Sequence, residues 1–484
     1  MYEDVFLAEF TEPGVTVYGP AGWQTIANPL YSYKFDPLDM SVFIYPGVSR
    51  MFSFFLFGPD SMSDAAVKLD EWTETMRAPT DMSADAVSQN NLVVDAMAQA
   101  LPSLQQRVYA LFSNYPTYST FSNKRWGALM NLDEGSYDSC ESVHDTVHMT
   151  VGQRGHFEYI SFSAFDPIFF LHHAMIDRLL ALWQSIYPDS WVEPAPSIEP
   201  SFTTAMGQMQ DATSPLTPFR KDANGGFWDS NMVRDPATFG YSYEDMHLDI
   251  TNKTERQIAL IRTISSLYGG SSPAGVLKRA ARTTTGQDDS NLEGQVAVRT
   301  LAHTDWENEP NFSSRFVVPA PKADVLIRNG SYVEWLANVH VNEGRLNGSF
   351  SIHFFVGRLP ESPSEYSSAP NLVGTTSVFA MPPRPGMPPR NGKVSSTVPL
   401  TAALLRLVSM QQLGSLQGDD VVPLLERRLK YRVVDHMGQV AYVTPQLELS
   451  IAIASSNVEA PGSDREFPRW GPFQTHFLLE GTME

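Results

Sequence analysis

The residues of this sequence best suited to metal chemistry are its histidines. All eleven lie at or beyond position 144, and five of them fall close together: His144, His148, His156, His172 and His173. Residues four apart in a helix lie one above the other, so His144 and His148 can present two imidazole nitrogens to one ion at about 2 Å. The spacing therefore predicts part of a metal site.

His172 and His173 are adjacent and so lie about 100° apart around a helix axis. We therefore expect only one of them to be a ligand, and we assign His173. Asp177 lies one turn further on, where it can fix the local geometry, and an apolar stripe follows the same face: Phe169, Ile176 and Leu180. His156 is expected to be a loop or supporting residue, and the others are expected to be structural: His247, His303, His340, His353, His436 and His476.

A lone HxxxH pair occurs by chance in many exposed helices. The interpretation of His144 and His148 as metal ligands is supported by the second helix. There His172 and His173 lie inside an apolar segment, where an imidazole needs a partner. Three neutral imidazoles without a thiolate or carboxylate suit copper or zinc. The single cysteine, Cys140, excludes an intrachain disulfide and any cysteine-rich metal site.

Composition narrows the classes of partner. The chain has 34 basic and 54 acidic residues, a formal net charge of -20, which opposes binding of nucleic acid or an anionic membrane. Hydrophobic residues make up 42% and charged residues 18%, as in a globular protein. No stretch of about 18 apolar residues occurs, and the acidic first residues do not resemble a secretory signal. We therefore expect a cytoplasmic protein.

Four of the histidines, at 144, 148, 172 and 173, fall on two expected helices, over residues 139–151 and 164–187. The second helix is opened by an Asp-Pro pair suited to a helix start. Residues 63–76 and 103–115 also have the pattern of core-facing helices. Residues 1–60 are rich in proline, glycine and aromatics and are expected to form long loops with little regular structure.

The second half of the chain changes character. Residues 251–269 are a further helical candidate, and small polar residues after them have the composition of a flexible linker. From about Lys322, apolar and polar residues alternate between turn-forming sequences such as LNGS and HMGQ. This pattern predicts a β-sandwich.

These segments together resemble a known family. Residues 163–184, SAFDPIFFLHHAMIDRLLALWQ, preceded by HDTVH, closely resemble the second copper-binding signature of the tyrosinases and catechol oxidases, type-3 copper proteins, in their fungal branch. The resemblance extends over most of the chain, through NPLYSYKFDPLD at 28–39, the tyrosine motif FGYSYED at 239–245, and residues 332–357, which resemble the fungal C-terminal domain.

The resemblance implies a fold, a ligand set and a reaction. It implies a mainly α core of the type-3 copper kind over residues 1–246, incomplete for want of the copper A helices. A linker over 247–321 and a β-sandwich shielding domain over 322–484 would follow. His144, His148 and His173 match the copper B ligands. The implied activity is oxidation of phenols and catechols by O₂ to ortho-quinones in pigment (melanin) formation.

One departure from the family is large. Members bind two coppers through six histidines, the first three of which precede the segment that NPLYSYKF resembles, and here no histidine precedes His144. The simplest explanation is an incomplete chain, and the second is a degenerate protein. Two other functions therefore stay open: a non-enzymatic remnant binding at most one copper, and haemocyanin-like oxygen binding. Whether the chain is an enzyme is left undecided, as is its oligomeric state.

A smaller departure lies beside the site. Asp145 stands where many tyrosinases carry Asn, a position thought in the family to help steer proton removal from a monophenol. The alternative is an aspartate on the helix surface near its N-terminus.

Overall fold

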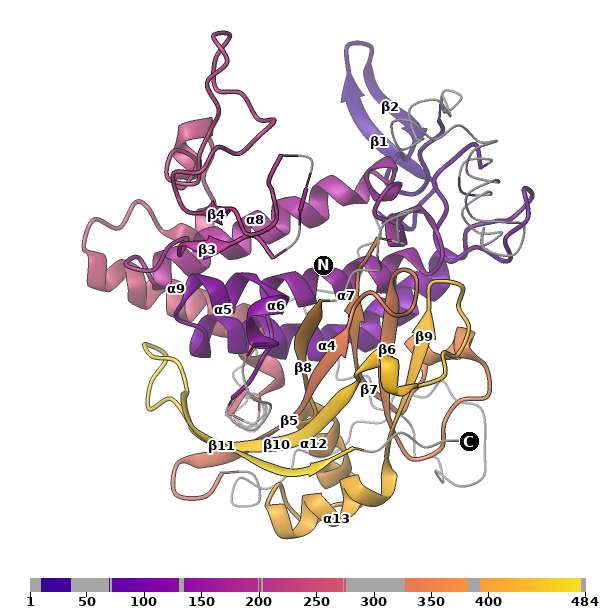
Figure 1. Cartoon of the computed structure of the whole chain (residues 1–484), viewed down its shortest axis with the longest axis vertical. Coiled ribbons are helices and arrows are strands. Elements are labelled where there is room, and N and C mark those ends of the chain that lie inside the picture. Colours follow the sequence, from indigo (N-terminus) through magenta and orange to yellow (C-terminus); the bar gives the residue numbers. More distant parts are fainter. Residues whose placement is uncertain are drawn as a thin grey trace.

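The computed structural model describes residues 10–35, 69, 72–129, 135–198, 200–201, 203–272, 274–275, 327–381 and 392–479. It contains a helical unit, residues 10–275, and a C-terminal domain of two sheets, residues 327–479. In Figure 1 the helical unit occupies the upper part and the sheets the lower part, and α4 and α7 lie between them.

The helical unit is built on four helices: α4 (Asn90–Asn114), α7 (Cys140–Gly152), α8 (Ile168–Ile186) and α9 (Lys253–Tyr268). Two short helices, α5 (Tyr118–Ser122) and α6 (Lys124–Gly127), join α4 to α7, and two short strands, β3 (Ala195–Pro196) and β4 (Met209–Gln210), follow α8. The apolar faces of the four long helices share one core, with Val108, Val147, Leu182 and Ile264 at its centre. Helices were expected over 139–151, 164–187 and 251–269, and all three are confirmed.

Three expectations for the first part of the chain need correction. The helix expected over 103–115 begins at Asn90, because Pro102 lies inside α4 without ending it. The helix expected over 63–76 is absent over 72–76, where the chain runs extended beside residues 33–35, while residues 63–68 lie outside the described ranges. A hairpin, β1 (Gly14–Gly19) and β2 (Gly22–Ala27), lies within residues 1–60, which were expected to have little regular structure.

Helix α8 is anchored at its start by a buried ion pair. The Arg77 Nε and Nη2 atoms donate to the two oxygens of Asp166 at 2.6 and 2.7 Å, and both side chains are almost fully buried. Asp166 Oδ1 also accepts the backbone N–H of Ile168, the first residue of α8, at 3.0 Å. Arg77 reaches the carbonyl of Leu30 as well, at 2.7 Å. This pair fixes the end of α8 nearest the histidines to the N-terminal loops.

The C-terminal domain holds two antiparallel sheets around one core, as expected. One sheet has the order β11-β10-β5-β8 and the other β7-β6-β9. Their strands are β5 (Ser331–Asn342), β6 (Phe350–Val356), β7 (Leu372–Val378), β8 (Lys393–Pro399), β9 (Leu429–Asp435), β10 (Ser450–Glu459) and β11 (Arg469–Leu478). Trp335 and Val339 of one sheet and Ile352 and Phe354 of the other belong to the same buried cluster, closed by α12 (Thr401–Ser409) and α13 (Gly418–Arg428).

The expected domain boundaries, with a core over 1–246, a linker over 247–321 and a C-terminal domain over 322–484, stay a prediction. Within the range 247–321, α9 packs through Leu260, Ile264 and Tyr268 into the core of the helical unit. Residues 276–326 lie outside the described ranges. Among the helices that the structure describes, none is long and apolar enough to cross a membrane.

The Arg77–Asp166 pair leads to the first prediction. Replacing Arg77 by Met should lower the free energy of unfolding by about 3–5 kcal/mol, because it leaves the Asp166 carboxylate buried without its cation. Urea denaturation measures the change. The control is Arg358→Met, which removes an ion pair with Glu361 in which both side chains are mostly exposed and should change stability little. Equal effects in the two variants would contradict the anchoring role of Arg77.

Candidate metal centre

Helix α7 carries two of the predicted ligands on one face. Ser139 caps it through a reciprocal pair of hydrogen bonds with Ser142, and the helix ends at Gly152 in a turn in which Gln153 has a φ of 44°. Gly155 then approaches the backbone so closely that a Cβ atom there would lie 2.0 Å from the Met76 carbonyl oxygen. This tight reversal brings the short helix η2 (His156–Glu158) back against α7.

His148 is held from both sides. Its Nδ1 atom lies 2.8 Å from the Phe157 carbonyl oxygen, and its ring stacks on the Phe157 ring with centroids 4.2 Å apart. A carbonyl oxygen can only accept, so Nδ1 carries the proton and Nε2 presents a lone pair. That lone pair points toward α8.

His144 is oriented in the same way by its neighbour. Its Nδ1 atom lies 3.0 Å from Asp145 Oδ1. Burial tends to raise the pKa of Asp145, but the Lys124 ammonium and the His144 hydrogen bond outweigh it and lower the pKa to about 2. The carboxylate is therefore ionised and accepts the Nδ1 proton, which leaves the Nε2 atom of His144 free to bind a metal.

The third predicted ligand faces these two from α8. His173 Nε2 lies 3.1 Å from His144 Nε2 and 3.3 Å from His148 Nε2, and the Phe169 ring packs on it at 3.9 Å between centroids. Two nitrogens bound tetrahedrally at about 2.0 Å from one ion lie about 3.3 Å apart. The observed distances fit a single ion bound by three imidazoles, a donor set that suits copper.

His172 also belongs to this cluster, although only one residue of the pair was expected to face the centre. The four histidines place ligand nitrogens within 4.8 Å of one another, and the His172 ring stacks on His144 with centroids 5.0 Å apart. The ring of His172 is fully buried and packs against the rings of His144 and His148, with centroids 5.0 Å from each. It therefore packs α8 against α7 beside the three converging nitrogens.

Burial keeps three rings of the cluster, those of His148, His172 and His173, in the neutral form. Burial, assisted by the neighbouring imidazoles, lowers the pKa of His148 to about 3 and that of His173 to about 4, and it holds the pKa of His172 well below its usual value. At neutral pH these three rings carry no charge. Deprotonated imidazoles are the form that binds metals.

Comparisons with known proteins agree with this geometry. The family model of the common central domain of tyrosinase matches residues 6–186, and that of the tyrosinase C-terminal domain matches residues 334–453. This chain belongs to the fungal-type tyrosinase family. A tyrosinase of Neurospora crassa is 27% identical over 90% of this chain and 69% of its own length, and one of Podospora anserina is 28% identical over 85% and 71%. The structure of a recombinant mushroom tyrosinase has the same fold, with a TM-score of 0.67 at 23% identity over 97% of this chain and 74% of that one.

The tyrosine motif of this tyrosinase-family chain contacts the middle of α8, the helix that carries His173. Tyr241 and Tyr243 donate their hydroxyl protons to Asp177 Oδ2 at 2.8 and 2.5 Å, and Arg178 pairs with Asp245. Asp177 was expected to help fix the geometry around His173. The contacts show how it does so, by tying α8 to residues 241–245.

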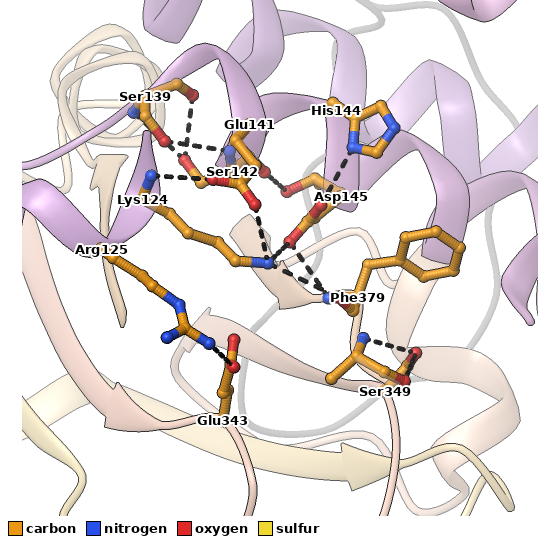
Figure 2. A network of polar contacts seen from close by, with 12 residues as sticks. Lys124, Arg125, Ser139, Glu141, Ser142, His144, Asp145, Glu343, Ser349 and Phe379 are labelled. Carbon is orange, nitrogen blue, oxygen red and sulfur yellow. Dashed lines mark hydrogen bonds and ion pairs between the residues drawn. The ribbon is translucent and has the colours of Figure 1, made fainter. Parts of the chain in front are cut away.

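Two features beside the histidine cluster carried no sequence signal. The Phe379 ring, just after β7, stacks on His148 opposite Phe157, with centroids 4.2 Å apart and planes 12° apart. Asp145 is buried rather than on the helix surface, and it pairs with Lys124 of α6 at 2.7 Å (Figure 2). Neither contact is visible in the sequence because each joins residues far apart along the chain.

The histidines assigned structural roles lie elsewhere wherever the structure describes them. His156 accepts the Met76 N–H at Nδ1 and donates to the Leu69 carbonyl, 2.8 Å from Nε2. Others pair with hydroxyl groups: His247 with Thr263, His353 with Thr375 and His476 with Ser455. His303 lies outside the described residues.

The second prediction concerns the ligand set. Replacing His144, His148 or His173 by Ala should abolish copper retention, because each removes one of three converging nitrogens. His172→Ala is the matched control in the same cluster and should retain the metal. Metal analysis of the four purified variants decides the matter. Copper loss from His172→Ala together with retention in His173→Ala would reverse the assignment.

Proposed function

We propose that this chain provides the copper B site of a tyrosinase-like oxidase that converts phenols and catechols to ortho-quinones with O₂ and so feeds pigment formation. The convergence of three imidazole Nε2 atoms from α7 and α8, with that of His173 3.1 and 3.3 Å from the other two, carries the proposal. His144, His148 and His173 would hold the copper, which supplies redox chemistry when bound. The cytoplasmic location expected from composition stays a prediction.

The protein residues around the site orient the ligands and restrict access to them. Asp145 and the Phe157 carbonyl fix the protons of His144 and His148 on Nδ1, so both Nε2 atoms face the site. Phe379 lies flat on the outer face of His148. An aromatic substrate stacking on this imidazole would have to replace the Phe379 ring, which supports a shielding role for the C-terminal domain.

A second candidate function is non-enzymatic binding of one copper. The observation that favours it is the absence of histidine before His144 in the whole sequence, since the family's reaction uses two coppers. Haemocyanin-like oxygen binding is the weaker alternative, because the match to the tyrosinase C-terminal domain over residues 334–453 favours the oxidase branch.

The third prediction concerns how much copper this chain binds and whether it consumes oxygen. The 484-residue chain should take up at most one copper and show no steady oxygen consumption with a catechol, because one histidine cluster able to hold a metal lies in the described part of the chain. Metal analysis and an oxygen electrode provide the two measurements. Two coppers with steady consumption would mean that other histidines form a second site. A chain that takes up no copper would contradict the proposed site itself.

The fourth prediction tests shielding. Limited proteolysis should cut between about Ser271 and Asn291, a small and polar segment that lies mostly outside the described residues. Release of the C-terminal domain should then speed removal of copper by a chelator, because Phe379 no longer covers His148. The control is the same protease treatment stopped before cleavage. Precipitation of the helical part after cleavage would instead support a stabilising role for the domain.

A further inference from the structure

Lys124 occupies a site that is costly for a lysine. It is 5% exposed and lies where α6, α7 and the end of β7 meet. Its ammonium nitrogen is 2.7 Å from Asp145 Oδ2, 3.5 Å from Glu141 Oε1 and 3.5 Å from the Phe379 carbonyl oxygen (Figure 2). A buried ammonium is tolerated only when paired in this way. Partners from both the helical unit and the C-terminal domain hold this one.

The Asp145 carboxylate contacts the C-terminal domain through one oxygen and His144 through the other. Oδ2 accepts from Lys124 and from the backbone N–H of Phe379, 3.1 Å away, while Oδ1 accepts from His144 Nδ1. The oxygen that orients a proposed metal ligand is therefore part of the same rigid group as the oxygen that binds the C-terminal domain. Figure 2 shows His144 and Phe379 on either side of this carboxylate.

Phe379 is held at both of its main-chain polar groups. Its N–H donates to Asp145, and its carbonyl accepts from Lys124. The next residue is fixed in turn, because the Ala380 N–H donates to Ser349 Oγ at 3.1 Å. The Lys124–Asp145 pair therefore sets the position of the Phe379 backbone and, through it, the ring that lies on His148.

We propose that Lys124 is a positioning residue that couples docking of the C-terminal domain to the orientation of His144. The inference rests on the proposed copper site. In the docked state Lys124 and the Phe379 amide together fix the Asp145 carboxylate. Its other oxygen, Oδ1, then accepts a hydrogen bond from His144 Nδ1. Undocking removes both main-chain contacts of Phe379, and Lys124 also loses the Ser395 hydroxyl that donates to its carbonyl at 2.9 Å. The coupling must also run in reverse, so a metal on His144 favours docking.

The wild-type chain gives the first test. Hydrogen exchange is measured with and without Cu(II) as the sole added ligand, after metal analysis has established copper uptake. Copper should slow exchange of the Phe379 amide about fivefold or more, a typical size for coupling between sites. The amide of Ile453, in strand β10 of the other sheet, should not change. Copper uptake without any change at Phe379 overturns the coupling, whereas failure to take up copper overturns the copper site.

Variants then assign the effect to Lys124. Lys124→Met should abolish the copper effect on Phe379 exchange and speed chelator removal of copper about tenfold, as second-sphere changes commonly do. Lys124→Arg keeps the charge and should retain the coupling. The matched control is the double variant Arg125→Met/Glu343→Gln, which removes a neighbouring ion pair at the same interface that contacts neither Asp145 nor Phe379 (Figure 2).

The control decides between positioning and general stability. If the double variant loses the copper effect as fully as Lys124→Met does, Lys124 only stabilises the interface and the proposal is wrong. If Lys124→Met does not fold, Lys124→Arg and the wild-type measurement still decide. Loss of the copper effect in a folded Lys124→Arg protein would show that the charge on residue 124 is not what transmits the coupling.

Discussion

The structure depends on helix α7 having almost no face toward solvent. A helix buried between a helical core and a sheet must satisfy every polar side chain internally. Its valines pack into the helical core, and His144 and His148 face α8. Asp145 faces α6 and the end of β7, while Ser142 and Thr146 accept from the guanidinium of Arg107. The candidate ligands His144 and His148 are thus held in place, because α7 cannot shift without breaking several buried contacts.

Convergence of the ligands follows from anchoring α8 at two points against this fixed helix. Asp166 ties its start to Arg77, and Asp177 ties its middle to the tyrosine motif. His173 lies between these anchors. The three Nε2 atoms therefore approach to about the spacing of a coordination shell through protein contacts alone. A site preorganised in this way does not spend metal-binding energy on gathering its ligands.

The sequence was most informative where the signal is local. Residues spaced four apart on a helix, and an apolar segment around a histidine pair, are enough to predict α7, α8 and the three candidate ligands. The sequence did not predict that His172 lies beside the other three histidines. Adjacent residues leave the helix about 100° apart, but their long side chains can adopt rotamers that bring both rings to the same cluster. Phe379 and Lys124 were missed for another reason. Phe379 contacts Asp145 and Lys124 across 234 and 255 residues, and Lys124 contacts Asp145 across 21, separations that periodicity does not encode.

The contacts between the helical unit and the C-terminal domain determine how easily the C-terminal domain can dissociate. The two large apolar clusters are distinct, one within the helical unit and one within the sheets, although Phe467 of the C-terminal domain packs against the first. Several contacts across the boundary are polar: Asn338 donates to the Gly135 carbonyl at 2.8 Å, and Arg107 donates to the Thr375 carbonyl at 3.4 Å. Water can replace such contacts at modest cost, whereas a shared apolar core would have to be exposed. The polar contacts therefore hold the covering domain in position over the histidines without adding to the apolar surface that its departure would expose.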